Sequence, residues 1–462
     1  TFQTKERVIM TDSSDHLRQV AADLIARAKA HGVTSADVLA AEGDSVSVQV
    51  RLSAVDRLSK AREKSLGIRV FFGKRSASTS TSDFTPESLD QLVADTCTLA
   101  KAVAEDDTSG LPDEGVMASD HPDLDLFDPT ILTIDEEIAL ARRAEDAAMA
   151  ADARITNSEG ADCAYGNGSV VLANTHGFLD SHRSSRFSLS VSPIAVDEKN
   201  GGGMQRDSWY TIKRKYSLLD TPESIGQIAA ERTIRRLGAT KVSTQRVPVI
   251  FDTETAESLL GHLASAISGY ILYKGASFLL GQLGKRIAPE FVCVEDDGRL
   301  VGGLGSRPFD GEGLATRRNI ILENGVLSSY LLDTYSGRKL GMPSTGNAAR
   351  SVGENPSVAT TNFFLRPGTT TPKEIIGSVK QGLYVTELIG FGVNMLTGDY
   401  SRGASGLWIE NGELAYPVEE VTIAGNLKRI FEQIEVIGND LEFRGRMASP
   451  TIKIAEMTVA GN

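Results

Sequence analysis

The 462-residue chain is poor in cysteine, in aromatic residues and in long apolar runs. It has three cysteines and no Cys-x-x-Cys pair, which excludes a disulfide framework and a cysteine-rich zinc module. No stretch approaches the roughly 18 consecutive apolar residues of a membrane-spanning helix, and residues 1–20 lack the apolar core of a signal peptide. We therefore expect a cytoplasmic protein with no membrane association.

Basic residues are outnumbered as well. Lys and Arg total 48 against 61 Asp and Glu, so the formal net charge is -13 at pH 7. A surface of this sign repels phosphate backbones and anionic lipids, and we do not expect nucleic-acid binding as the main activity. Residues 1–9 precede Met10, which could be the natural start of the chain.

Apolar spacing predicts amphipathic helices over residues 13–31 and 222–238 and from Pro86 onward. Thr133 and Glu136 have the spacing of a capping box at the start of another helix. These helices favour an α/β organisation for the first half of the chain.

Strands are predicted where apolar residues alternate or where glycines close short apolar runs, at residues 46–50, 67–73 and 155–210. In the second half, Asn324-Gly325 and Asn411-Gly412 each lie between apolar strand segments, the strongest local signal for a hairpin. The chain is therefore expected to be an α+β protein. We predict an N-terminal α/β domain over residues 1–238 and a β-rich C-terminal domain over residues 239–462, built on a large mixed sheet or barrel.

A helix is predicted over about residues 253–268, and it contains a lone histidine, His262. A metallopeptidase helix needs two imidazoles and a carboxylate, and no second ligand or base follows His262 within a turn. Packing at a helix interface is therefore the favoured interpretation of this histidine.

Two further groupings could carry chemistry. Cys163, His176 and His182 lie in the glycine-punctuated β region, although their spacing matches no zinc pattern. Ser336 and Lys339 have the Ser-x-x-Lys spacing of a serine nucleophile with a lysine base, without the companion motifs. Ordinary structural roles are the favoured alternative for both groupings.

The most unusual stretch is residues 397–406, which is rich in glycine and small polar residues and directly precedes a strand. Exposed backbone at such a place can accept an extended peptide by strand addition. Alternatively, Asp399 and Arg402 pair with each other or cap a turn, and the sequence leaves these two interpretations open.

Four segments of the second half resemble the TldD/PmbA family, and specifically its PmbA branch, also called TldE. These segments are Leu259–Gly269, Gly303–Gly313, Leu331–Asn347 and Gly382–Lys428. The first half is similar in layout more than in motif. The resemblance implies a cytoplasmic two-chain metalloprotease, in which a TldD-type subunit and a PmbA-type subunit degrade unfolded or extended peptides inside a closed chamber. The family is also linked with peptide-precursor maturation, antitoxin turnover and modulation of DNA gyrase.

TldD-type chains carry His-Glu-x-x-x-His on the corresponding helix. Here Gly261 and Ala266 stand at the two histidine positions, and His262 stands at the glutamate position. The resemblance therefore implies that these metal-helix positions are vacant and that this chain has no metal, cofactor or catalytic residue of its own. Zinc is expected in a TldD-type partner of a heterodimer, and Asp399, Tyr400, Ser401 and Arg402 are the expected substrate contacts.

Two rival hypotheses follow from the same residues. The first is a self-sufficient hydrolase that uses Ser336 and Lys339, or a metal held by Cys163, His176 and His182. The second is a regulatory binding protein of the gyrase-modulator type without proteolysis. A homodimer of the isolated chain is compatible with each hypothesis.

Overall fold

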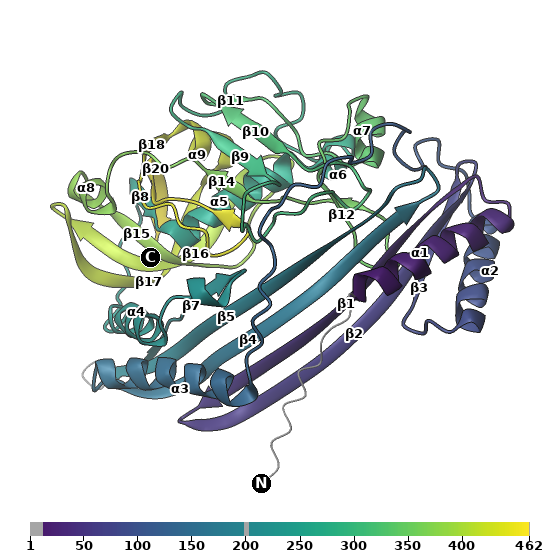
Figure 1. The fold of residues 1–462 in the computed structure, drawn as a ribbon. Coiled ribbons are helices and arrows are strands. Elements are labelled where there is room, and N and C mark those ends of the chain that lie inside the picture. The colour runs from purple at the N-terminus through teal and green to yellow at the C-terminus, as the bar shows by residue number, and fades with distance from the viewer. Residues whose placement is uncertain (1–12, 198–202, 462) are drawn as a thin grey trace, which may run out of the picture.

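A long, curled sheet dominates the first half of the chain in the computed structural model, which describes residues 13–197 and 203–461 (Figure 1). The strand order is β3-β2-β1-β4-β5-β6, and β7 also pairs with β5. Met10, considered above as a start, lies outside the described residues. The strands are β1 (Ser35–Arg51), β2 (Ala54–Phe72), β3 (Arg75–Thr81), β4 (Ile155–Asn174), β5 (Leu179–Asp197), β6 (Gly203–Arg206) and β7 (Trp209–Lys213).

Helices cover both ends of one face of this sheet (Figure 1). Ala36, Val38 and Ala40 of β1 are buried in the same apolar cluster as α1 and α2, whereas Val48 and Val50 are buried with α3 and α4. Because side chains alternate between faces along a strand, these five residues lie on one face. The helices are α1 (Ser13–Ala30), α2 (Pro86–Ala102), α3 (Ile134–Ala151) and α4 (Pro222–Ile234), with a short 3-10 helix at Tyr216–Leu218.

The second half contains a closed barrel. Its strands follow the order β17-β16-β15-β8-β20, and β20 pairs again with β17, so the sheet closes on itself. The β15–β8 pair is parallel and the other pairs are antiparallel. The strands are β8 (Gln245–Phe251), β15 (Gln381–Ile389), β16 (Asp399–Glu410), β17 (Glu413–Asn426) and β20 (Ile452–Ala460), with β18 (Ile434–Ile437) beside β20.

Within the described residues, the second half of the chain also contains a smaller sheet and the helices α5 to α9, of which α6 and α7 lie near the end of the long sheet (Figure 1). The smaller sheet has the order β11-β10-β9-β14-β19, and β12 pairs with β13 separately. Its strands are β9 (Val294–Asp297), β10 (Arg318–Glu323), β11 (Val326–Leu327), β12 (Ala348–Ala349), β13 (Ser357–Val358), β14 (Phe363–Leu365) and β19 (Met447–Ala448). The helices are α5 (Thr253–Ala266), α6 (Gly269–Tyr273), α7 (Thr334–Leu340), α8 (Pro372–Gly377) and α9 (Leu427–Glu432).

Buried polar contacts join the two halves at the end of the long sheet near α7. Asp37 of β1 accepts hydrogen bonds from Arg69 of β2 and from Arg350 of the second half, each at 2.5 Å. Burial alone would raise the pKa of Asp37, but the two guanidinium groups hold it below its usual range. Tyr335 of α7 donates to Asp106, in the segment after α2, at 2.8 Å. The halves are therefore connected by charged groups as well as by apolar packing.

The structure confirms the predicted fold class, an α+β protein with an α/β first half and a β-rich second half that contains a mixed sheet and a barrel. Thr133 and Glu136 form the predicted capping box, and Asn324 and Asn411 have the positive φ values, 51° and 52°, that their turns require. The helix predicted over residues 222–238 ends earlier, at Ile234. The predicted boundary between residues 238 and 239 falls between α4 and β8 and stays a prediction.

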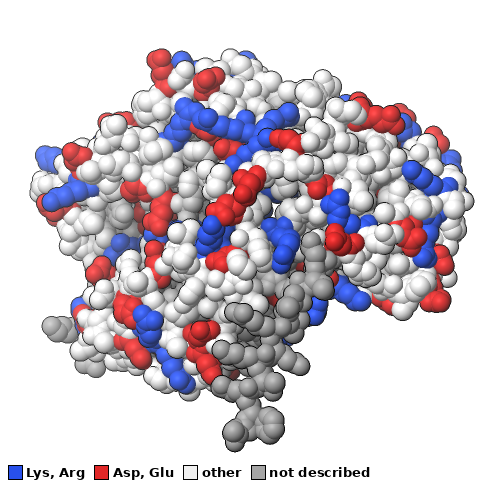
Figure 2. Space-filling model, in the orientation of Figure 1, with Lys and Arg blue, Asp and Glu red and all other residues white. Residues whose placement is uncertain are grey.

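Acidic and basic side chains are intermixed over the face drawn in Figure 2. Many of them are joined in ion pairs, such as Arg143 with Glu223 at 2.7 Å. None of the helices within the described ranges is long and apolar enough to cross a bilayer.

Candidate functional site

Helix α5 is the element that the sequence singles out for metal chemistry. Asp252 caps it, because its side chain accepts the backbone N–H of Thr255 at 2.8 Å. Its apolar side enters the main core of the second half through Leu259, Leu260 and Leu263. These contacts fix the directions in which the other side chains of α5 point.

Gly261 and Ala266, the two positions that the resemblance assigns to metal-binding histidines, carry no side-chain ligand atom. Gly261 has no side chain, and a Cβ atom built there would contact only the sulfur of Met447, at 3.9 Å. Ala266 is fully buried in the core. Across residues 13–197 and 203–461, no group of three His, Cys, Asp or Glu side chains is arranged to hold a metal ion.

His262 faces β16 from α5. Its ring lies 5.9 Å from the ring of Tyr400 in an edge-on arrangement, and its Nε2 is buried without a partner in the described structure. Burial, with a smaller contribution from Arg402, lowers the pKa of His262 to about 4. The imidazole is therefore neutral at physiological pH, and it packs at an interface, as the sequence suggested.

The stretch Asp399–Arg402 begins strand β16, and its backbone is already paired on both sides. Tyr400 lies opposite Gly425 of β17, and the backbone N–H of Ser401 donates to the Gly392 carbonyl at 2.7 Å. The expected free edge for strand addition is therefore missing, because β17 and the segment at Gly392 occupy both sides. The binding role of the four side chains stays a prediction.

Asp399 caps a turn instead of pairing with Arg402. Its carboxylate accepts hydrogen bonds from Thr397 at 2.7 Å and from Asn426 at 3.1 Å. Arg402 contacts the Leu388 carbonyl at 3.4 Å, and its Nε is buried without a partner. The hydroxyl of Tyr400 is likewise buried and unpaired within the described part of the chain.

His262, Tyr400 and Arg402 therefore form a partly buried polar cluster between α5 and β16, which we call the α5–β16 cluster. It offers O–H and N–H donors and an imidazole nitrogen. No carboxylate is among its three members, and the imidazole of His262, with a pKa of about 4, is a weak base, so the cluster is suited to hydrogen-bonding a ligand more than to activating water.

Ser336 and Lys339, the candidate nucleophile and base, are both engaged elsewhere. The Ser336 hydroxyl donates to Asp333 at 2.5 Å, within the capping box of α7. The Lys339 ammonium lies 3.4 Å from Asp106. Burial lowers the pKa of Lys339, but the hydrogen bond to Asp106, the charge of Asp106 and the neighbouring Tyr335 together outweigh this effect, and the pKa is raised. A raised pKa is the opposite of what a lysine base needs.

Cys163, His176 and His182 are not brought together, so the proposed metal site is wrong. Cys163 lies opposite Val48 and His182 opposite Val170, and these two pairs lie on opposite faces of the sheet. Cys163 is buried beneath α3, where burial raises its pKa to about 12. His176 lies in the β4–β5 turn, 4.0 Å from Glu114. Alternation along paired strands separates these residues, and their register could not be read from the sequence.

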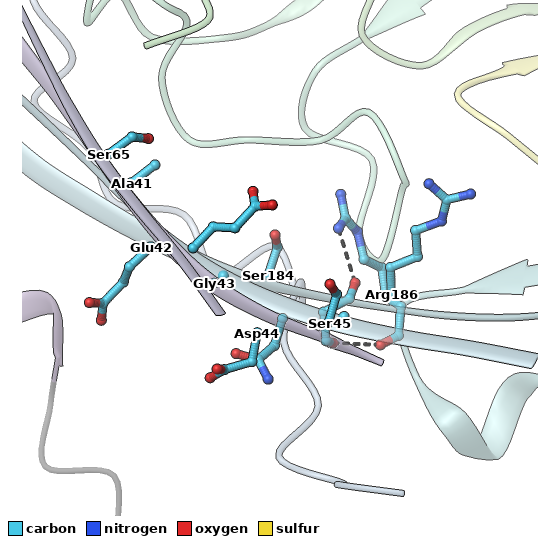
Figure 3. Close-up of a pocket in the computed structure, with 14 residues that line it drawn as sticks. Ala41, Glu42, Gly43, Asp44, Ser45, Ser65, Ser184 and Arg186 are labelled. Atoms are coloured by element: carbon cyan, nitrogen blue, oxygen red, sulfur yellow. Dashed lines mark hydrogen bonds between the residues drawn. The ribbon is translucent and has the colours of Figure 1, made fainter. Parts of the chain in front are cut away.

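Sequence reasoning missed a groove of about 410 Å³ across the middle of the long sheet (Figure 3). Small residues form its floor, among them Gly43, Gly166 and Gly168. Ser65, Ser184 and Arg186 point to the groove side in Figure 3, while Glu42 and Asp44 point to the other face. The only sequence signal was a set of glycines and serines at alternate positions on separate strands.

The groove lies on the face of the sheet that meets the second half of the chain. Leu39 and Gly43 are four residues apart on β1 and so share a face, and Leu39 packs in one cluster with Phe309. Two arginines, Arg186 and Arg214, and the acidic Glu63 also line the groove. Burial, and then the charge of Arg186, lowers the pKa of Arg214. A charged groove with a flat floor can hold an extended polar chain.

Three family models match successive parts of the chain. Residues 36–102 match domain 1 of the PmbA/TldA metallopeptidases, residues 127–237 match the central domain, and residues 244–461 match the C-terminal domain. The chain belongs to the PmbA/TldD family. This confirms the resemblance inferred from the four segments of the second half.

Relatives of this PmbA/TldD-family chain align over almost its whole length. It is 42% identical over 426 residues to metalloprotease PmbA of Escherichia coli O157:H7, covering 92% of each chain. It is 38% identical over 455 residues to a metalloprotease PmbA homolog of Haemophilus influenzae, covering 98% of each. A solved structure from Bacteroides thetaiotaomicron, described as a candidate modulator of DNA gyrase, matches with a TM-score of 0.90 at 28% identity, over 98% of this chain and 100% of that one.

The family name implies a metal ion, and the residues of α5 do not fit one. The positions Gly261 and Ala266 supply no ligand atom, and His262 alone cannot complete a coordination shell. The chain is thus a metalloprotease-like member of the PmbA/TldD family.

Proposed function

We propose that this chain is the subunit without a metal centre in a two-chain PmbA/TldD-type peptidase of the cytoplasm. A TldD-type partner would supply the zinc and activate the water, and this chain would build part of the chamber wall and contact the substrate. The observation that carries the proposal is the composition of α5, where Gly261 and Ala266 stand at the ligand positions.

The proposed substrate is an unfolded or extended peptide. In the groove over Gly43, Gly166 and Gly168, the absence of side chains on the floor would let a peptide backbone approach the sheet closely. Arg186 and Glu63 would contact charged groups of the peptide from the groove lining. In the stretch 399–402, Asp399 and Ser401 are exposed, so side-chain contacts are the form of binding that we propose there.

Metal analysis combined with a cleavage assay tests the proposal. The chain is purified alone and together with a TldD-type subunit, and both samples are measured for zinc and for cleavage of a fluorogenic, unstructured peptide. We expect substoichiometric zinc and no cleavage for the lone chain, and zinc together with cleavage for the pair. One tightly bound zinc and full cleavage activity in the lone chain would refute the proposal.

Two controls make this result specific. His262→Ala in this chain should leave the zinc content of the pair unchanged, because the histidine is not a ligand in the proposal. Size-exclusion chromatography of the lone chain distinguishes a monomer from a homodimer before the partner is added.

The gyrase-modulator description of the Bacteroides relative supports a second candidate, a regulatory binding protein. A pull-down with the full chain separates the two functions. Recovery of a TldD-type chain favours the peptidase subunit, and a stable complex with gyrase in the absence of that chain favours the regulator.

A further inference from the structure

A cavity of about 460 Å³ lies where the long sheet meets α6 and α7 (Figure 1). One side comes from β2, β3 and the segment after α2, and the other comes from α6, α7 and residues 355–358. The α5–β16 cluster and the groove of Figure 3 contribute none of the residues that line this cavity. The lining residues that matter chemically are Arg69, Tyr270, Tyr273, Glu312, Asp333 and Tyr335.

Two buried carboxyl groups line this cavity, and each has one oxygen left over. Glu312 Oε2 accepts the backbone N–H of Thr334 at 2.8 Å, and Asp333 Oδ1 accepts the N–H and hydroxyl of Ser336 at 2.8 and 2.5 Å. Glu312 and Asp333 are each only 4% exposed. The Thr334 side chain also lies close enough to Glu312 to lower the pKa of its carboxyl group, although burial outweighs this effect and the pKa is raised. Glu312 Oε1 and Asp333 Oδ2 are not among the fully buried unpaired atoms of the described residues, and both side chains line the cavity, so a ligand in the cavity can donate hydrogen bonds to them.

The neighbouring arginines do not neutralise these carboxyl groups fully. Arg69 and Arg350 both bind Asp37, at 2.5 Å each. These two guanidinium groups face the carboxyl groups of Asp37, Glu312 and Asp333. Burial, and then the charge of Asp310, raises the pKa of Glu312 to about 7, so the carboxylates outnumber these two guanidinium groups only at a pH where Glu312 is ionised. Lys74 also lines the cavity, but it is exposed, and solvent screens its charge.

The walls are aromatic. Tyr273 lies between Tyr270 and Tyr335, with ring centroids at 5.6 and 5.9 Å and edge-on geometry. Lys274 places its ammonium 4.0 Å from the ring centre of Tyr270, and Lys339 places its ammonium 5.3 Å from that of Tyr335, so two of the three rings already face a cation. No lysine or arginine of the described chain lies over the ring of Tyr273. A cation with an apolar body would meet carboxylate oxygens at one end and ring surfaces along its length.

We propose that this cavity is a binding site for a primary ammonium group carried on a short aromatic or aliphatic body. The ammonium would donate to Glu312 Oε1 and Asp333 Oδ2, and the body would pack against the three tyrosines. A peptide N-terminus and a lysine side chain share this chemistry. The proposal rests on the cavity alone and holds whether or not the chain is a peptidase subunit.

The test is calorimetric titration of the full chain with 2-phenylethylamine, 2-phenylethanol and 3-phenylpropionate. These probes have a similar ring and chain but differ in charge. We use pH 8, where the amine is protonated and Glu312, whose pKa burial raises to about 7, is ionised. We expect saturable binding of one amine per chain, binding of the alcohol weaker by at least about tenfold, and no binding of the carboxylate. Equal binding of amine and alcohol would overturn the proposal.

Variants locate the site. Glu312→Gln should weaken amine binding by about tenfold or more, whereas Glu432→Gln, an exposed position at the end of α9, should leave it unchanged. Because Glu312 is buried, its variant could fail to fold, so Tyr270→Ala serves as a second test. Tyr270 is 51% exposed, and its loss should weaken amine binding several-fold without unfolding the chain. Amine binding that survives in every folded variant would place the ligand elsewhere and refute the assignment.

Two further probes distinguish the natural sources of the ammonium. Phe-Gly-Gly with a free N-terminus is compared with its N-acetyl form, and Nα-acetyl-lysine amide is titrated separately. Binding of the free tripeptide alone identifies a peptide N-terminus, and binding of the lysine derivative alone identifies a side chain. Failure of all the amines to bind refutes the site, while leaving the metal and cleavage test of the proposed function untouched.

Discussion

Glu137 of α3 is the residue whose effect on the pH dependence of folding stability can be tested most directly. Its side chain is completely buried, and neither carboxyl oxygen has a hydrogen-bond partner in the described structure. It lies beneath the helix near Cys163, in a region whose core is apolar. Burial raises the pKa of Glu137 from 4.5 to about 7.

This shift makes folding stability depend on pH with a definite sign. Below pH 4.5 the carboxyl group is protonated in both the folded and the unfolded chain, so it carries no penalty. Between pH 4.5 and about 7 the unfolded chain releases a proton that the folded chain retains, and the free energy of unfolding falls as pH rises. At 1.36 kcal/mol per pKa unit, the full loss is about 3 kcal/mol, of which about 2.5 kcal/mol falls between pH 5 and pH 8.

Glu137→Gln keeps the shape of the side chain and removes the titration. We expect the difference in unfolding free energy between the variant and the natural chain to shift by about 2.5 kcal/mol in favour of the variant from pH 5 to pH 8. Urea denaturation at both pH values measures this shift, and any fixed cost of burying the amide cancels between them. Glu231→Gln, at an exposed position of α4, is the control and should show no such shift.

A difference between variant and natural chain that stays constant from pH 5 to pH 8 would refute the reasoning. It would mean that Glu137 reaches water or a partner when ionised. A shift of similar size in Glu231→Gln would instead point to a change in the unfolded chain, and the two outcomes are separable in one series of measurements.

Two other substitutions test the packing of the fold. Asp37→Asn leaves Arg69 and Arg350 without their shared carboxylate and should cost about 3–5 kcal/mol in urea denaturation, while Asp23→Asn, which removes a surface pair with Arg27, should cost about 1 kcal/mol or less. Equal losses in the two variants would contradict a buried role for Asp37. Gly406→Ala in β16 drives a Cβ atom into the Tyr384 carbonyl and should destabilise the barrel by about 1–3 kcal/mol. The control is Gly377→Ala, which has open space around it and should be neutral or slightly stabilising. A neutral Gly406→Ala would argue against the strand register described for the barrel.

Features determined by neighbouring residues could be predicted from the sequence. The capping box of Thr133 and Glu136 spans one helical turn, and the Asn-Gly turns at 324–325 and 411–412 need only two residues with positive φ. In each case the physical cause lies within a few residues.

Features determined by distant residues could not be predicted in this way. The stretch 399–402 is locally polar and was expected to offer exposed backbone, yet β17 and the segment at Gly392 pair with it from both sides. Cys163 and His182 are separated because strand register assigns them to opposite faces. The cavity where the long sheet meets α6 and α7 combines Arg69 with Glu312 and Tyr335, which lie more than two hundred residues further along the chain. Such contacts depend on topology, which local patterns do not determine.

The two helix-covered ends of the long sheet have a mechanical consequence. Strand β1 has 17 residues and so extends for about 55 Å, with one apolar nucleus under α1 and α2 and a separate one under α3 and α4. These two apolar clusters share strands but no side chains, so each end of the sheet is packed independently of the other. Destabilising one cluster should leave the other packed, and hydrogen exchange of the backbone amides should then show different protection at the two ends of the same strand.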